Sequence, residues 1–136
     1  MMLELHVPDF EKVKAFYQRL GFEKVWERAP DGFKGYLVMQ MEDNILCFWC
    51  GNESVLDHPY FKDFPKSTPL VKGVEVVLTT SHLDELYAKL KGDDCVVEKI
   101  ETKPWGLCDF RMKDPYGYYL RLTTPHDIKS MEWAVP

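Results

Sequence analysis

The order of expected helices and strands occurs twice along this chain, and this internal repeat constrains the fold more than any other feature. Tyr17 and Tyr87 are 70 positions apart, and Leu46 and Leu120 are 74 apart. Loops can absorb the difference between the two spacings. Two copies at this distance indicate two halves of one fold, because a solenoid would show at least three shorter repeats.

The first copy begins with alternating apolar and polar residues at positions 2–7, a pattern typical of a half-buried strand. Asp9 can then N-cap a helix whose apolar stripe ends at Gly21. Three more strands are expected, over residues 22–28, 33–41 and 45–50. This order of elements is one βαβββ module.

The second copy repeats that order. A strand is expected over residues 72–79, and a helix follows that ends at Gly92. Ser81 opens this helix and Asp84 stands three residues on, a pattern close to a capping box. The remaining strands are expected over residues 95–102, 107–113 and 118–124.

The repeat predicts an α+β fold in a single domain over residues 1–136. Module 1 covers about residues 2–50 and module 2 about residues 71–124. A polar, proline-containing connector of residues 51–70 joins them, and residues 125–136 form a tail. One helix covers only one face of each four-stranded sheet, so we expect two tandem modules that form curved mixed sheets around a cup.

Composition and charge narrow the range of partners. The chain has 17 basic and 22 acidic residues, a formal net charge of −5, and this balance disfavours nucleic acid because such ligands need a basic surface. No apolar stretch approaches the roughly 20 residues that span a bilayer, and the N-terminus lacks a signal-peptide pattern. Four cysteines are too few for a secreted disulfide scaffold, so we expect a cytoplasmic protein.

Strand parity predicts which side chains line the cup. In DPYGYYLRLTTP, residues 114–125, Leu120 and Leu122 point toward the helix whereas Tyr119 and Arg121 point the other way. The same alternation in the other strands gives a mixed aromatic, acidic and basic surface, which is typical of a ligand site. With one further aromatic residue from a loop, the predicted ligand-binding residues are Glu4, His6, Cys47, Trp49, Glu75, Trp105, Tyr119 and Arg121.

Some of these residues have more than one interpretation. Glu75 and Arg121 can form an ion pair that only stabilises the cup, or one that anchors a ligand. His6 can be a hydrogen-bonded part of the wall, or a general base with Glu4. His58 falls in the connector, where a surface position is expected. No motif for a catalytic triad or a nucleotide site is present, and we predict no catalytic residue.

Four segments of the chain resemble the vicinal oxygen chelate superfamily, which contains glyoxalases, bleomycin-resistance proteins and dioxygenases. FYQRLGF is similar to the helix-to-strand signature of that family, and GVEVVLTTSHLDELYAKL to its second-half strand and helix. PWG and DPYGYYLRL resemble its closing hairpin, with Tyr118 where the family usually has Asn. The resemblance extends from Leu3 to Thr124.

The resemblance also allows the metal-ligand positions of the family enzymes to be compared with this chain. The four positions fall on Met2, Cys47, Glu75 and Arg121. Arginine stays cationic and has no lone pair to donate, so it cannot coordinate a metal ion. The resemblance therefore implies that the metal site is lost and that the protein has no cofactor.

Two functions remain open from the sequence. The first is a metal-free homodimer of the bleomycin-resistance type, which binds and sequesters a cationic or aromatic antibiotic without chemistry. The second is a metal-dependent lyase, isomerase or dioxygenase of the same superfamily. Its atypical metal site would use Glu4, His6, Glu75 and Cys47. Membrane and nucleic-acid partners are not expected in either case.

Overall fold

The structure is a computed structural model that describes residues 1–65, 67–68 and 70–129. The fold is α+β, with two repeated modules that each combine a four-stranded mixed sheet and one helix. This fold class is the one that the internal repeat predicts. Most of the expected tail, residues 130–136, lies outside the described residues.

The chain divides into two compact units. The first holds residues 1–72 with the turn 115–117, and the second holds residues 73–114 and the chain from residue 118 onward. Each sheet lies within one unit, and each unit is therefore described by itself. The single domain and the shared cup remain predictions.

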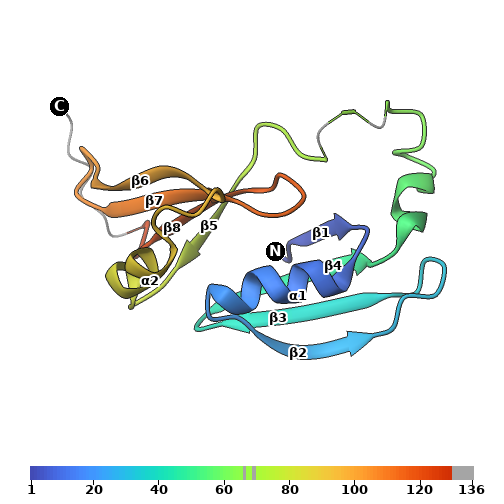
Figure 1. Ribbon diagram of the computed structural model, residues 1–136, viewed down its shortest axis with the longest axis horizontal. Helices are drawn as coiled ribbons and strands as arrows, with labels where there is room; N and C mark the ends of the chain where they lie inside the picture. The colour runs from blue at the N-terminus through green and yellow to red at the C-terminus, as the bar shows by residue number, and fades with distance from the viewer. Residues whose placement is uncertain (66, 69, 130–136) are drawn as a thin grey trace. The chain divides into compact units, whose positions relative to one another are not determined.

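Four strands and a helix build the first unit: β1 (Glu4–Val7), α1 (Phe10–Arg19), β2 (Glu23–Arg28), β3 (Tyr36–Met41) and β4 (Asn44–Cys50). The strand order is β1-β4-β3-β2, with β1 parallel to β4 and the other neighbours antiparallel. Figure 1 shows α1 lying along one face of this sheet. The opposite face is therefore left for other contacts.

Helix α1 begins and ends at the expected residues. Asp9 Oδ1 accepts the backbone N–H of Glu11 at 2.8 Å, and Gly21 follows the helix with a φ of 102°, which favours glycine. Tyr17 is fully buried, and its ring centroid lies 5.2 Å from that of Phe48 on β4. This contact places Phe48 on the helix-covered face, so its neighbours in β4, Cys47 and Trp49, point to the other face.

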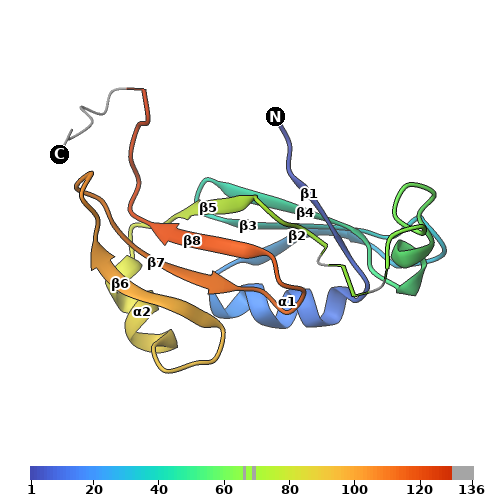
Figure 2. The same ribbon diagram turned by 90° about the horizontal axis from the view of Figure 1, so that it is seen from above.

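The second unit repeats the arrangement with β5 (Glu75–Thr79), α2 (Leu83–Leu90), β6 (Val96–Thr102), β7 (Cys108–Lys113) and β8 (Tyr119–Thr123). The strand order is β5-β8-β7-β6, and β5 is parallel to β8 (Figure 2). Tyr87 on α2 lies 5.1 Å from the fully buried ring of Phe110 on β7. Asp109 and Arg111 therefore point to the face that α2 leaves open.

The start of α2 differs from the prediction. His82 rather than Ser81 stands at the N-cap, and it makes no side-chain capping bond. Thr80 Oγ1 accepts the backbone N–H of His82 at 3.1 Å, so a hydroxyl one position earlier holds the entry to the helix. The preceding strand is also shorter than expected, since it begins at Glu75 and leaves Val74 exposed.

Two loops that matter for the site are ordered by polar side chains. In the connector, the short 3₁₀ helix Glu53–Asp57 begins where Asn52 Oδ1 accepts the N–H of Ser54 at 2.8 Å. In the turn before β8, Asp114 Oδ1 accepts the N–H of Tyr118 at 2.9 Å, and Tyr118 is buried. Within the described part of the chain, no helix has the length and apolar character needed to cross a membrane.

Candidate functional site

The face of the first sheet opposite α1 carries several of the predicted residues. The register of β1 and β4 places Glu4 beside Cys47 and His6 beside Trp49. Tyr36 on β3 lies on the other side of Trp49. Three adjacent strands thus bring aromatic, acidic and imidazole groups to one surface.

Trp49 is at the centre of this surface. Its ring stacks on Phe33 with a centroid distance of 5.4 Å and an interplanar angle of 13°. Its indole Nε1–H donates to the backbone oxygen of Phe33 at 3.1 Å, which fixes the orientation of the ring. The imidazole of His6 lies 4.8 Å away on another side of the indole.

The connector supplies two more rings. His58 lies 5.6 Å from Trp49 and 5.8 Å from His6, and Phe61 lies 5.3 Å from His6. We call His6, Phe33, Trp49, His58 and Phe61 the aromatic cluster. Phe33 is 48% exposed and Phe61 37%, so part of each of these two rings is accessible to solvent.

The two imidazoles of the cluster differ in their surroundings. Burial lowers the pKa of His6, and His58 adds to that effect, whereas Glu4 at 3.5 Å opposes it. The Nδ1 of His58 accepts the backbone N–H of Tyr60 at 3.1 Å, so this nitrogen carries no proton. Burial thus disfavours a positive charge on His6 within the cluster.

Cys47 is buried beside this cluster and is joined to a tyrosine. Burial, together with hydrogen bonds to Cys47 and Glu4, raises the pKa of Tyr36. Cys47 and Cys50 are both free thiols, as are the other two cysteines. This part of the surface thus holds a neutral phenol between a thiol and a carboxylate.

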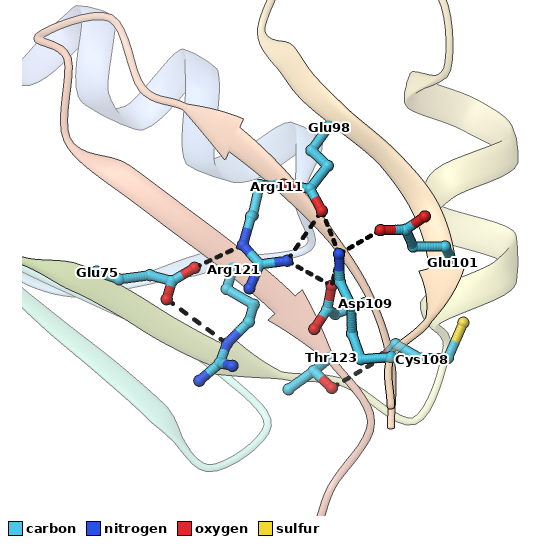
Figure 3. A network of polar contacts seen from close by, with 9 residues as sticks. Glu75, Glu98, Glu101, Cys108, Asp109, Arg111, Arg121 and Thr123 are labelled. Atoms are coloured by element: carbon cyan, nitrogen blue, oxygen red, sulfur yellow. Dashed lines mark hydrogen bonds and ion pairs between the residues drawn. The ribbon is translucent and has the colours of Figure 1, made fainter. Parts of the chain in front are cut away.

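The open face of the second sheet carries a charged network centred on Arg111. Its Nε donates to Glu75 Oε1 at 2.9 Å, and its Nη1 donates to Asp109 Oδ1 at 2.7 Å and Glu98 Oε1 at 3.3 Å (Figure 3). The Arg111 side chain is only 11% exposed. Three carboxylates therefore neutralise a mostly buried guanidinium.

Lys103 extends the network at the end of β6. Its ammonium group pairs with Glu98 and Glu101, and it lies 3.9 Å from Asp109. Asp109 is 1% exposed, and burial raises the pKa of its carboxyl group although Arg111 and Lys103 act in the opposite direction. Arg121 acts in the same direction, so the charge of this buried carboxylate depends on three cationic neighbours.

Glu75 contacts two arginines, Arg111 as well as the expected partner Arg121. Arg121 Nε lies 4.0 Å from Glu75 Oε2, at the limit of an ion pair, whereas Arg111 holds the other oxygen much more closely. Sequence reasoning did not select Arg111. The alternation of Asp109 and Arg111 with the buried Phe110 in β7 is the signal that points to it.

The remaining predicted residues also belong to the second unit. Tyr119 is exposed on β8 beside Glu75, and Trp105 is half-buried in the turn between β6 and β7. The structure therefore groups the predicted site residues into two sets. Glu4, His6, Cys47 and Trp49 lie on the first unit, and Glu75, Trp105, Tyr119 and Arg121 lie on the second.

The residues at the four metal-ligand positions of the family do not fit a divalent cation. Met2 precedes β1 and is exposed, and Cys47 is buried against Tyr36. Glu75 is bound by Arg111, and Arg121 places a second positive charge beside it. Among the residues that the structure describes, no group of three or more His, Cys, Asp or Glu side chains could hold a metal ion.

Comparison with models of protein families identifies the family of this chain. The model of the Glyoxalase/Bleomycin resistance protein/Dioxygenase superfamily matches residues 2–122, which is nearly the whole chain. The protein therefore belongs to this superfamily. A search of curated protein sequences finds no match.

Solved structures show the same similarity. A bleomycin-binding protein complexed with bleomycin is 26% identical, with a TM-score of 0.61 over 93% of this chain and 98% of that one. A bleomycin resistance determinant encoded on the transposon Tn5 is 25% identical, with a TM-score of 0.63 over 93% and 98%. A superfamily member from Sphaerobacter thermophilus is 24% identical, with a TM-score of 0.63 over 92% and 97%.

Proposed function

We propose that the protein binds and sequesters a cationic or aromatic small molecule, such as an antibiotic, without a metal ion and without chemistry. The aromatic cluster is the observation that carries this proposal. Trp49 is fixed by a hydrogen bond and by stacking on the exposed ring of Phe33. The exposed ring of Phe61 lies against His6 and His58. Pre-ordered rings bind planar or cationic groups at little entropic cost.

Three further observations support the same class of ligand. The chain has a formal net charge of −5, which attracts cations. Burial lowers the pKa of His6, which disfavours a positive charge within the cluster. The similar structure that contains bleomycin shows that a related chain of nearly the same length binds such a compound.

The proposed working form is a cytoplasmic homodimer. Each four-stranded sheet has two edge strands, β1 and β2 in the first unit and β5 and β6 in the second. Pairing with a second chain would cover such edges and enclose the exposed rings. The four free thiols agree with a reducing compartment.

A thermal-shift screen of cationic glycopeptide antibiotics and planar aromatic compounds tests this proposal. A ligand at a hundred times its dissociation constant should stabilise the protein by about 2.7 kcal/mol, an easily measured shift. Elemental analysis of the same preparation should recover no stoichiometric metal. A metal ion at one per chain, together with substrate turnover, would instead indicate an enzyme.

A further inference from the structure

Two arginines face each other across neighbouring strands of the second unit. Arg111 on β7 and Arg121 on β8 are direct cross-strand partners. Like charges in such positions repel each other and destabilise a sheet unless anions lie nearby. The distribution of carboxylates around the two guanidinium groups therefore shows which of them is left for another partner.

The nearby carboxylates are shared unequally. Arg111 has three carboxylate oxygens at 2.7–3.3 Å. Arg121, in the described part of the chain, has one ion-pair contact, at 4.0 Å to an oxygen of Glu75. The other oxygen of Glu75 already accepts from Arg111. Arg121 is thus a much less neutralised cation than its neighbour.

The hydrogen-bonding capacity of Arg121 is also largely unused. Its Nε is buried and has no hydrogen-bond partner among the described residues, and the side chain as a whole is 24% exposed. A guanidinium has five N–H donors in a planar fork that matches an oxyanion. Figure 3 shows the terminal nitrogens of Arg121 directed away from Glu75.

Apolar surface lies next to this fork. Val77 on β5 is the direct partner of Arg121, and Tyr119 precedes it by two positions on the same face of β8. Both side chains are exposed. An anion that reaches Arg121 therefore has an aromatic ring and an aliphatic side chain beside it.

We propose that Arg121 binds an oxyanion, the carboxylate or phosphate group of a small aromatic ligand, while Tyr119 and Val77 contact the ring of that ligand. Arg111 acts as a positioning residue, because it holds Glu75 and so keeps that carboxylate from closing on Arg121. The inference rests on the aromatic branch of the proposed ligand-binding function, and it narrows those aromatic ligands to compounds that carry a negative group.

Matched probes test this site. Naphthalene-1-acetate and 1-naphthylmethylamine share a ring system and differ in charge, and inorganic phosphate tests the anion without a ring. Calorimetric titration at constant ionic strength should show that the acid binds and that the amine binds more weakly. Binding of the acid but not of phosphate assigns the anchor to carboxylates, and the reverse result assigns it to phosphate groups.

Three variants make the test specific. Arg121→Gln should weaken binding of the anion by about tenfold to a hundredfold, since a charge-assisted hydrogen bond is lost. Arg121→Lys, which keeps the charge and loses the fork, should retain part of the affinity. Lys91→Gln removes an exposed charge at the end of α2, on the other face of the sheet, and should leave the affinity unchanged. Thermal melts of each variant confirm folding.

The inference is overturned if no anionic probe binds, or if Arg121→Gln binds the acid as tightly as the parent protein. Tighter binding of the amine with no effect of Arg121→Gln would also overturn it. In that last case binding that depends on Trp49 would still support the proposed function, so the two failures are distinguishable. Equal losses in Arg121→Gln and Lys91→Gln would show general charge attraction and would likewise refute a specific anchor.

Discussion

Arg111 Nε donates to Glu75 Oε1 at 2.9 Å, although β8 lies between the strands that carry the two residues. The long arginine side chain thus reaches across the face of a neighbouring strand and joins β5 to β7. The same guanidinium holds Asp109, which is almost completely buried. The network therefore stabilises the second sheet as well as arranging its open face.

Replacement of Arg111 should destabilise the protein strongly. Arg111→Met leaves Asp109 buried without its closest cation, and a broken buried ion pair of this kind costs about 3 kcal/mol. Urea denaturation measures the loss. Lys113→Met on the same strand is an exposed control and should change the free energy of unfolding by less than about 0.5 kcal/mol. Equal effects of the two substitutions would show that the network contributes little.

The stability of the protein should fall as the pH falls below the ordinary pKa of histidine. Burial and the neighbouring His58 lower the pKa of His6 in the folded state, so the unfolded chain takes up the proton first. The loss begins as the pH falls through the unfolded value of about 6.5 and is complete below the folded pKa. Glu4, at 3.5 Å, reduces the size of this effect.

Denaturation at a series of pH values measures that dependence. The His6→Asn variant should show a shallower decrease in unfolding free energy between about pH 7.5 and pH 5 than the parent protein. His82→Asn is the control, because His82 is exposed at the start of α2. An unchanged slope in His6→Asn would show that His6 is not the group responsible.

Sequence reasoning predicted the strands and the faces of their side chains well, because alternation is a local property. It placed Tyr119 and Arg121 on one face of β8 and Leu120 and Leu122, both fully buried, on the other. It missed the contact of Arg111 with Glu75, since that contact depends on strand order and side-chain reach rather than on parity alone.

The connector and the helix start were harder to predict for a different reason. His58 was expected at the surface, yet it is half-buried against Trp49, because a loop without periodicity gives no signal of its contacts. Ser81 was expected to cap α2, but His82 stands at the N-cap, and the hydroxyl of Thr80 accepts the backbone N–H of His82. The sequence identifies which residues can cap the helix, but which of them does so depends on the folded backbone.

Trp105 should contribute to ligand binding. It is half-buried in the turn between β6 and β7, so Trp105→Ala should leave the fold intact. Loss of a stacking contact of this kind costs about 2 kcal/mol, which is roughly a thirtyfold loss of affinity. Fluorescence and calorimetric titrations of a ligand found in the thermal-shift screen measure the change. Undiminished affinity would exclude Trp105 from the site.

The protein should form a homodimer in solution. Sedimentation velocity at micromolar concentration should give a species of twice the 16.0 kDa chain mass, because pairing would cover the edge strands. A single species at the mass of one chain would contradict the proposed homodimer.

Calorimetric titration of metal-free bleomycin into protein that has been dialysed against a chelator tests the central claim most directly. The account predicts saturable binding with a fixed stoichiometry, unchanged by added zinc or nickel and strongly weakened in Trp49→Ala. Lys12→Ala, which alters an exposed side chain on α1 at the other face of the sheet, is the control and should bind as the parent does. Absence of binding until a divalent metal is added, or equal affinity in Trp49→Ala, would contradict the account.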